Sequence, residues 1–210
     1  MVRAWLVAAI AVFFAFGDSA PVDLVDQPTP VVNAAFLGDS YTAGSGASQP
    51  DRRWTTLVST SEGWIEHNFG LGGTGYSTRN NYLSRIPEII ASKPDVVVVS
   101  GGINDWPDLN SDPTTLFQEV RDTYLQLRQD LPMATIIGVG PTFTSDLTPA
   151  RVEFNQTVSE AVTSVGGVFV SLILPTVVIE PAMVNPDRTH VNDSGHAAIA
   201  QRVISALTKK

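Results

Sequence analysis

The chain contains a series of short runs in which apolar residues stand at consecutive positions. The clearest run is DVVVVS at 95–100, similar runs occupy 31–37, 134–140 and 168–173, and a weaker one covers 64–71. A strand that is buried on both faces is apolar at consecutive positions, whereas a strand with one face in water alternates between apolar and polar residues. The runs therefore predict five strands in a sheet that is covered on both sides.

Segments with helical features separate these runs. Residues 112–132 start with Asp112 as a helix N-cap and Pro113 at the first helical position, where proline is favoured. Residues 148–167 end at a glycine pair, and residues 193–210 carry lysines at the C-terminal end, where the helix dipole favours positive charge. Strands that alternate with helices form βαβ units. The sequence thus predicts one α/β domain of three layers with a five-stranded, mostly parallel sheet.

The first twenty residues have a different character. Arg3 precedes an uninterrupted apolar stretch at 4–17, and small residues follow at Ser19 and Ala20. This is the layout of a secretory signal peptide, and the stretch is shorter than the ~20 apolar residues that a membrane-spanning helix needs. We therefore expect a signal peptide at 1–20, and an uncleaved membrane anchor is the alternative.

Removal of this segment would define the mature chain and its location. Cleavage after Ala20, or alternatively after Gly17, precedes an extended, proline-containing lead-in at 21–30 and a single domain at 31–210. The chain has no cysteine, so neither a disulfide nor a lipidated cysteine is available to it. We expect a protein that is secreted or held in the cell envelope, without stable insertion of the mature chain in a membrane.

The charge of the chain argues against two classes of partner. Its 13 lysines and arginines stand against 21 aspartates and glutamates, which gives a formal net charge of -8 at pH 7. Proteins that bind nucleic acid or anionic lipid present a basic surface to the phosphates. We therefore expect no nucleic-acid partner and no binding to an anionic lipid surface.

Polar, glycine-rich turns follow the predicted strands. Ligands of a parallel α/β sheet bind at the carboxyl ends of its strands, so residues in these turns are expected to share one edge. The turns, with the segment before the last helix, are GDSYTAG at 38–44, GLGGTGY at 70–76, GGINDW at 101–106, GPTFTSD at 140–146 and NPDRTHVNDSGH at 185–196. The short polar stretch 106–112 is expected to form a loop at the same edge.

The residue types at this edge suit nucleophilic catalysis. A serine hydroxyl such as that of Ser40 needs an adjacent base, and the base needs a third group to orient it. Asp187 and His190 are three residues apart, so they can meet within a single turn of chain. Acyl transfer also requires hydrogen-bond donors for the developing oxyanion. The N–H of Ser40, a glycine N–H within 70–76 and the amide of Asn104 are candidates.

The same segments resemble the four sequence blocks of the SGNH, or GDSL-type, hydrolases in the order that defines the family. GDSYTAG matches the first block and NFGLGGTG the second, while GGIND and DRTH are similar to the third and fourth. The resemblance implies Ser40 as nucleophile and Asp187 and His190 as its partners. It also implies an oxyanion hole of Ser40, Gly73 and Asn104, a flavodoxin-like α/β/α fold, and ester hydrolysis without a cofactor or a metal.

Several residues beside these motifs need a separate interpretation. Tyr41 stands where the family's short name has leucine, which is the one departure in the first block. Asp39 and Asp105 are expected to brace the turns by hydrogen bonds rather than to take part in the reaction. His67 lies in a predicted strand and His196 in the first turn of the last predicted helix, so both are expected to be structural.

An alternative use of the fourth block is a metal site. Asp187, His190, Asp193 and His196 follow one another at intervals of three residues, and all are possible metal ligands. Ligands must converge on one point, however, and the helix start at NDSG would separate them. This alternative predicts a metal-binding protein or a metallohydrolase in place of a serine enzyme.

The sequence favours a secreted serine esterase that cleaves carboxylic esters of small molecules or glycans through an acyl-enzyme on Ser40. A glycan O-deacetylase or acyltransferase with the same site is one alternative, and a catalytically silent envelope- or carbohydrate-binding module is another. Residues 174–186 are contiguous and largely apolar just ahead of Asp187. We expect them to form a shallow acyl cleft, which favours acetyl to hexanoyl esters, with Trp106 flanking the substrate beside Asn104.

Overall fold

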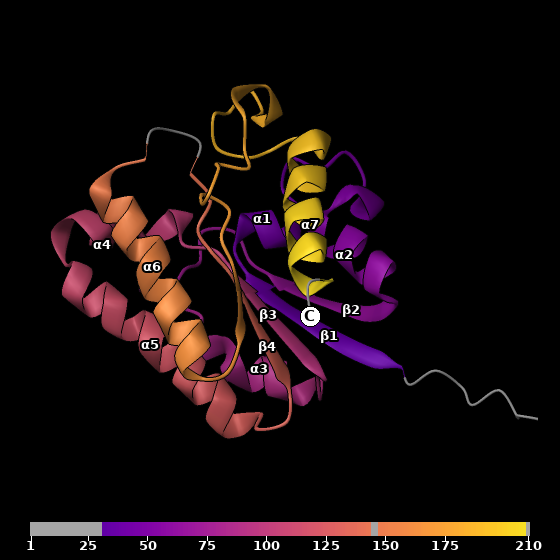
Figure 1. Cartoon of the computed structure of the whole chain (residues 1–210), viewed down its shortest axis with the longest axis vertical. Coiled ribbons are helices and arrows are strands. Elements are labelled where there is room, and N and C mark those ends of the chain that lie inside the picture. Colours follow the sequence, from indigo (N-terminus) through magenta and orange to yellow (C-terminus); the bar gives the residue numbers. More distant parts are fainter. Residues whose placement is uncertain (1–30, 144–146, 209–210) are drawn as a thin grey trace, which may run out of the picture. The chain divides into compact units, whose positions relative to one another are not determined.

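A computed structural model describes residues 31–143 and 147–208 of the chain. Its centre is a sheet of five strands in the order β2-β1-β3-β4-β5, in which neighbouring strands are parallel throughout (Figure 1). The strands are β1 (Val32–Gly38), β2 (Trp64–Gly70), β3 (Val96–Ser100), β4 (Thr135–Val139) and β5 (Val168–Val170). The predicted α/β fold with a five-stranded sheet is confirmed, and every strand pair in the sheet is parallel.

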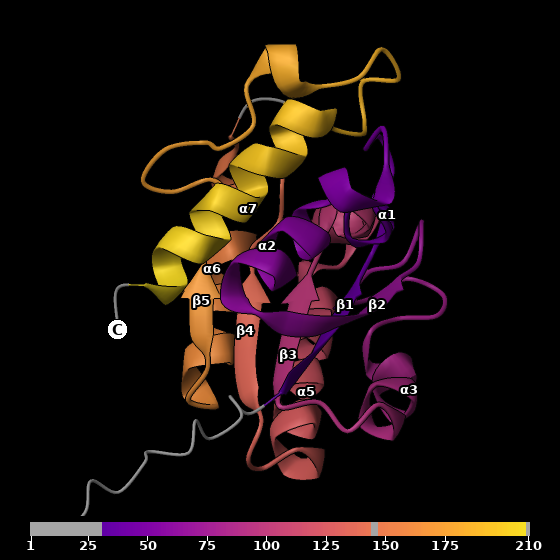
Figure 2. The ribbon, with the colours of Figure 1, turned by 90° about the vertical axis from the view of Figure 1, so that its right-hand side faces the viewer.

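Helices cover both faces of this sheet. They are α1 (Ser40–Ala43), α2 (Trp54–Glu62), α3 (Ile86–Ala91), α4 (Trp106–Ser111), α5 (Pro113–Asp130), α6 (Pro149–Ser164) and α7 (Asp193–Leu207). α1, α2 and α7 pack on one face, and α3 to α6 pack on the other (Figure 1, Figure 2). Asp112 caps α5 as predicted, because its carboxylate accepts the N–H of Thr115 at 3.2 Å. The three predicted layers are therefore present.

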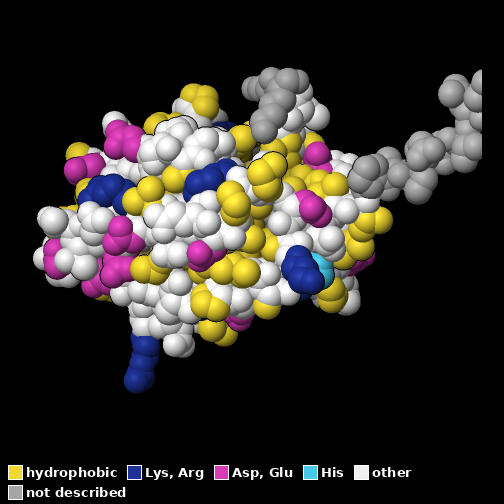
Figure 3. All heavy atoms as spheres, turned by 90° about the horizontal axis from the view of Figure 1, so that it is seen from below, with side chains coloured by type: hydrophobic (Ala, Val, Ile, Leu, Met, Phe, Trp, Pro, Cys, Tyr) yellow, Lys and Arg dark blue, Asp and Glu magenta, His cyan; other side chains and the backbone are white. Residues whose placement is uncertain are grey.

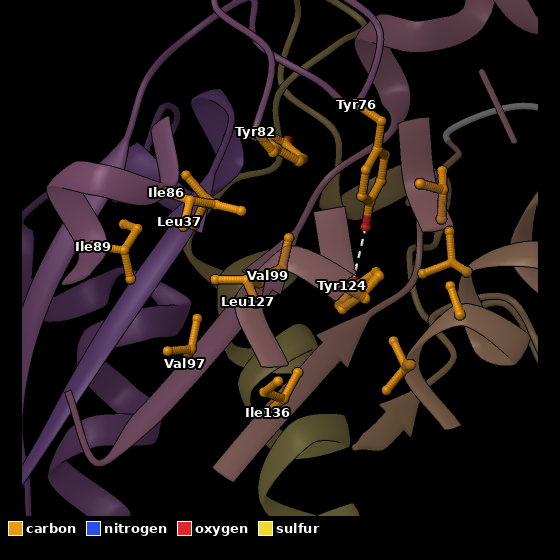
Figure 4. Close-up of a cluster of buried hydrophobic side chains, with 14 of the residues drawn as sticks. Leu37, Tyr76, Tyr82, Ile86, Ile89, Val97, Val99, Tyr124, Leu127 and Ile136 are labelled. Atoms are coloured by element: carbon orange, nitrogen blue, oxygen red, sulfur yellow. Dashed lines mark hydrogen bonds between the residues drawn. The ribbon is translucent and has the colours of Figure 1, made fainter. Parts of the chain in front are cut away.

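Each face of the sheet has its own hydrophobic cluster. Of the four consecutive valines at 96–99 in β3, Val97 and Val99 enter the cluster under α3 to α6, and the other two enter the cluster under α1, α2 and α7. Figure 4 shows the first cluster, in which the hydroxyls of Tyr76 and Tyr124 are hydrogen-bonded at 2.9 Å. Burial on both faces explains why β3 is an uninterrupted apolar run, whereas β2 at the edge of the sheet is only partly buried and contains polar residues.

The last strand is shorter than its sequence predicts. We expected a strand at 168–173, but β5 ends at Val170. The hydroxyl of Ser171 accepts the N–H groups of Ile173 at 3.3 Å and Leu174 at 2.9 Å, so the chain turns away from the sheet. Ile173 is nevertheless buried in the core. The apolar residues at the end of this run are therefore buried in the core without pairing in the sheet.

Helices also occur where the sequence did not indicate them. The polar stretch 106–112, which we expected to be a loop, forms α4, so that prediction was wrong. Pro107 in α4 and Pro87 in α3 occupy the first turn, where the missing N–H has no helical partner in any case. Leu109 is buried in the core, so the polar residues around it are the exposed side of a short amphipathic helix.

The surface and the N-terminal segment complete the description. Figure 3 shows the face seen from below Figure 1, at the amino ends of the strands, where basic side chains are scattered among acidic and apolar ones. Within the described ranges, no helix is long and apolar enough to cross a membrane. The predicted signal peptide at 1–20 and lead-in at 21–30 lie outside these ranges, so the domain boundaries stay a prediction.

Candidate active site

Ser40 is the first residue of α1 and follows β1, which lies between β2 and β3 in the sheet, almost directly. Gly38 and the N-cap Asp39 make the turn between them. A Cβ at position 38 would lie 2.1 Å from Thr42 Oγ1 and 2.5 Å from the Ser100 carbonyl oxygen, so only glycine fits. Ser40 is 9% exposed, and its N–H occupies the first helical position, which has no partner within the helix. The turn therefore presents both the hydroxyl and the N–H at the edge of the sheet.

His190 joins Ser40 to Asp187. The Nε2 of His190 lies 3.0 Å from Ser40 Oγ, and its Nδ1 lies 2.7 Å from Asp187 Oδ2. An ionised carboxylate can only accept, so a neutral imidazole here carries its proton on Nδ1. The unprotonated Nε2 is then left to accept the proton of Ser40. The structure brings together the three residues that the sequence suggested as nucleophile, base and orienting acid.

A tight loop builds the pair of Asp187 and His190. Asp187 Oδ1 accepts the N–H groups of Thr189 and His190, each at 3.0 Å, and Arg188 between them has a φ of 60°, in the left-handed region. The bond from the Thr189 N–H, followed by those from His190, lowers the pKa of Asp187 to about 2. The carboxylate therefore stays charged at neutral pH and keeps the imidazole in one orientation.

The glycine-rich turn after β2 lies against the nucleophile. A Cβ at Gly72 would lie 3.7 Å from the Cβ of Ser40, and the next residue, Gly73, has a φ of 77°, which favours glycine. Asn104 Nδ2 donates to the carbonyl of Thr74 at 2.9 Å, and this amide nitrogen carries a second N–H. The structure thus places Ser40, Gly73 and Asn104, the three candidate oxyanion donors, at the same edge.

Asp105 connects the turn after β3 with the turn after β2. Its fully buried carboxylate accepts the N–H groups of Tyr76 at 3.0 Å and Ser77 at 2.8 Å, and a Cβ at Gly75 would lie 2.4 Å from it. Burial raises the pKa of Asp105, although the hydrogen bonds from Ser77 and Tyr76 oppose the rise. These contacts fit the structural role expected for this residue, because they hold the neighbouring Asn104 against the second turn.

A cavity of about 250 Å³ opens beside Asn104. Its described lining residues are Ile103, Asn104, Trp106, Phe143, Arg151, Arg188 and Thr189. The guanidinium carbon of Arg151 lies 4.3 Å from the centre of the Trp106 ring and 4.7 Å from that of Phe143. None of these lining residues belongs to 174–186, where we expected the acyl cleft. The cavity is instead built by the segments after β3 and β4 and by the loop of Asp187.

Sequence reasoning missed part of this lining. Phe143 stands in the turn after the fourth strand and Arg188 lies inside the DRTH motif, so both were on segments expected at the edge. Arg151 lies in the first turn of α6, and nothing in the sequence around it indicated that it would reach Trp106. Trp106 lines this cavity together with Asn104, and its contact with a substrate stays a prediction.

The side chains of the alternative metal site point to different partners. His196 is buried, and its Nδ1 accepts the N–H of Trp54 at 3.4 Å while its Nε2 donates to the carbonyl of Ser45 at 3.2 Å. The carboxylate of Asp193 accepts the N–H of Ser48 at 2.8 Å. In the described part of the chain, no group of three or more His, Cys, Asp or Glu side chains is placed to hold a metal ion. These two residues instead fasten the start of α7 to the segment after α1.

Comparison with known sequences gives one family and one curated relative. Residues 36–198 match the sequence profile of the GDSL-like lipase/acylhydrolase family. A GDSL lipase of Mycobacterium tuberculosis is 26% identical over 200 residues, which cover 90% of this chain and 85% of the relative. The matched region includes the turn of Ser40, the turn of Gly73, Asn104 and the loop of Asp187 and His190.

Comparison with solved structures agrees on the fold. A protein of Lactobacillus plantarum superposes with a TM-score of 0.70 at 18% identity, covering 86% of this chain and 98% of the other. A two-domain esterase active on acetylated mannans superposes with a TM-score of 0.69 at 24% identity, covering 85% of this chain and 50% of the other. At these identities the likeness establishes the fold, and the chemistry has to be argued from the site.

Proposed function

The chain belongs to the GDSL-like lipase/acylhydrolase family and is a hydrolase that acts on esters, and we propose that it does so through an acyl-enzyme on Ser40. The observation that carries this proposal is the chain of hydrogen bonds from Ser40 Oγ to His190 Nε2 at 3.0 Å and from His190 Nδ1 to Asp187 at 2.7 Å. A nucleophile within reach of a base that a third group orients is the arrangement that acyl transfer requires.

The first half of the reaction forms the acyl-enzyme. Ser40 Oγ attacks the carbonyl carbon of the ester while His190 Nε2 takes the hydroxyl proton, and the carbonyl oxygen becomes an oxyanion. The N–H groups of Ser40 and Gly73 and the amide of Asn104 donate to that oxyanion. The intermediate then breaks its bond to the alcohol oxygen, which leaves with the proton from Nε2.

The second half releases the acid. Water attacks the acyl carbon while His190 Nε2 takes a proton from it, and the same donors stabilise the second oxyanion. Collapse breaks the bond to Ser40 Oγ, which recovers its proton from Nε2, and a carboxylic acid leaves. Asp187 keeps its negative charge throughout and stabilises the imidazolium that forms in each half. No electron donor or other reactant is needed.

The acyl group in this proposal is short. The cavity beside Asn104 has a volume of about 250 Å³, which is smaller than the ~300–1,000 Å³ of usual small-molecule sites. Each methylene of the acyl chain that is buried contributes ~0.8 kcal/mol, and this gain ends where the chain emerges into water. We therefore expect kcat/KM to be highest for acetyl to hexanoyl esters and to decline for longer chains.

A second candidate function is the deacetylation of glycans by the same residues. The observation that favours it is Trp106, which lines the cavity, stacks with Arg151 and is 36% exposed, so that a partly exposed aromatic side chain lies beside the site. The two-domain esterase with the same fold acts on acetylated mannans. In this version the acyl group is acetyl and the alcohol is a sugar hydroxyl.

One experiment tests the proposed function and separates the two candidates. The purified protein is assayed with nitrophenyl esters of increasing chain length and with acetylated mannan oligosaccharides, beside Ser40→Ala and the control Ser84→Ala, an exposed serine. We expect Ser40→Ala to lose activity on every substrate, and a fluorophosphonate to add once, at Ser40. A fully active Ser40→Ala protein, or an adduct on another residue, would contradict the mechanism. A maximum at lauroyl or longer esters would contradict the short acyl site.

A further inference from the structure

Tyr41, the residue that departs from the family's short motif, connects two distant parts of the site. Its hydroxyl donates a hydrogen bond to the main-chain carbonyl of Thr189, which is 148 positions away in the sequence. Tyr41 directly follows Ser40 in α1, and Thr189 directly precedes His190. The leucine of the short motif has no hydroxyl, so it cannot make this bond.

The tyrosine ring is held in a defined position. Tyr41 is only 4% exposed and belongs to the hydrophobic cluster under α1, α2 and α7, and its carbonyl accepts the indole N–H of Trp54 at 3.1 Å. The centre of its ring lies 6.1 Å from that of His190. Burial raises the pKa of Tyr41, so its hydroxyl stays protonated and can donate at any working pH.

Main-chain hydrogen bonds shape the loop that carries His190. The N–H of Asn185 donates to the carbonyl of His190 at 2.8 Å, and Val184 and Val191 form an antiparallel bridge. These bonds fix the shape of the loop, and the hydrogen bonds of Asp193 and His196 tie the start of α7, which follows the loop, to the segment after α1. The bond from Tyr41 is different, because it joins the residue directly before His190 to the helix that begins with Ser40.

We propose that Tyr41 is a positioning residue, whose hydroxyl holds the loop of His190 at the distance from α1 that brings Nε2 to Ser40 Oγ. This inference rests on the proposed function, since it assigns to Tyr41 the placement of the base in that mechanism. Tyr41 acts through His190 and does not touch the substrate. A base displaced by about 1 Å can lower catalysis by as much as ~10²-fold.

The test uses Tyr41→Phe, which removes the hydroxyl and keeps the ring. The matched control is Tyr124→Phe, which removes another buried hydroxyl with one hydrogen-bond partner, in the opposite cluster (Figure 4). We expect Tyr41→Phe to lower kcat by roughly 10- to 10²-fold with little change in KM, and Tyr124→Phe to leave kcat nearly unchanged. Amide hydrogen exchange at 188–190 should accelerate in Tyr41→Phe alone.

A double substitution shows whether the effect passes through the base. If Tyr41 acts only by placing His190, adding Tyr41→Phe to His190→Ala should cause no further loss of the residual activity, because the two effects are not additive. A further loss in that background, or a rise in KM, would overturn the inference by showing a direct contact with the substrate. An unchanged kcat and unchanged exchange at 188–190 in Tyr41→Phe would overturn it as well.

Ser40→Ala, measured in parallel, separates this inference from the function on which it rests. If Ser40→Ala is inactive and Tyr41→Phe is as active as the unaltered protein, the positioning role is wrong and the mechanism stands. If Ser40→Ala retains full activity, the mechanism itself is wrong, whatever the result for Tyr41. Thermal melting of Tyr41→Phe and Tyr124→Phe shows whether both variants are folded at the temperature of the assay.

Discussion

Asp39 is a carboxylic acid that the fold buries next to the proposed nucleophile. It is 1% exposed and caps α1 by accepting the N–H of Tyr41 at 2.9 Å. Burial raises the pKa of Asp39 from 3.8 to about 7, and the nearby charge of Asp105 adds to the rise, while the hydrogen bonds and His190 oppose it. The folded protein therefore holds a proton on Asp39 at pH values where the unfolded chain has lost it.

This proton makes the free energy of unfolding depend on pH. A raised pKa in the folded state contributes stability that is complete below pH 3.8 and is lost as the pH rises to about 7. In Asp39→Asn the helix cap is kept and the titration is removed. Between these pH values, we expect the free energy of unfolding of the unaltered protein to fall relative to that of Asp39→Asn by up to about 4 kcal/mol.

Urea unfolding of both proteins across this pH range measures the difference, with the exposed Asp51→Asn as control. Burial lowers the pKa of His196, so the titration of His196 changes the free energy of unfolding in the opposite direction. Both proteins contain His196, so the difference between their free energies of unfolding isolates the effect of Asp39. If the free energy of unfolding changes with pH in the same way in Asp39→Asn and in the unaltered protein, Asp39 is already ionised in the folded protein just above pH 3.8, and the prediction is wrong.

Asn104 is the candidate oxyanion donor whose side chain can be removed. Its amide is held by the Thr74 carbonyl at 2.9 Å, so the donor is already oriented before substrate binds. We expect Asn104→Ala to lower kcat by ~10²–10³-fold with little change in KM, because an oxyanion donor acts chiefly in the transition state. Steady-state kinetics on a short nitrophenyl ester provides the measurement, with the exposed Asn110→Ala as control. A change confined to KM would assign Asn104 to substrate binding.

Arg85 bonds to the ends of both β1 and β2. Its largely buried guanidinium donates to the carbonyls of Phe69 and Gly38, which lie at the ends of β2 and β1, ahead of the glycine-rich segment and of Ser40. We expect Arg85→Ala to lower the free energy of unfolding by about 1–3 kcal/mol, because it leaves these carbonyls without that donor. Urea unfolding measures this, with Arg121→Ala, an exposed arginine of α5, as control.

Arg85→Lys sharpens this prediction. Lysine keeps the positive charge but presents a compact ammonium, which cannot reach two carbonyls as the planar guanidinium does. We expect this variant to be intermediate in stability and to have a lower kcat than the Arg121→Ala protein. Wild-type stability in Arg85→Ala would mean that the two turns are held by their other bonds, such as that from the Leu71 N–H to the Gly38 carbonyl at 2.9 Å.

The strands and the edge that carries the site were predictable because burial on two faces leaves an uninterrupted apolar run. β3 is buried at all of its positions, and the polar turns after the strands then have to share one edge. The short helices α2, α3 and α4 were not predictable in the same way. They are six to nine residues long, and the prolines at the second position of α3 and α4 are typical of loops as well.

The contacts that assemble the site from distant segments were beyond the sequence. Tyr41 and Thr189 meet only because α1 and the loop before α7 lie on the same edge, and nothing in either segment indicates the partner. The stacking of Arg151 on Trp106 likewise joins α6 to α4. Local patterns predict which residues face the edge, whereas pairings between side chains depend on the packed geometry.

The N-terminal segment, which lies outside the described residues, carries a prediction about the whole chain. We propose that the protein is exported, because Arg3 and the apolar stretch at 4–17 have the layout of a signal peptide. In the producing organism, we expect the extracellular or envelope fraction to contain a chain that begins between Asp18 and Val22. N-terminal sequencing measures this. A membrane-bound form that begins at Met1 or Val2 would favour the anchor.

The strand order also has a consequence for how the protein is made. Ser40 follows β1, which lies between β2 and β3 in the sheet, whereas His190 stands 150 positions later in the sequence. During synthesis the proposed nucleophile therefore leaves the ribosome well before its base. A nascent chain can bury much of its core around β1 and β3 while the hydroxyl of Ser40 has no base beside it. Turnover of ester would then begin only after residues 187–190 have been made and packed beside Ser40.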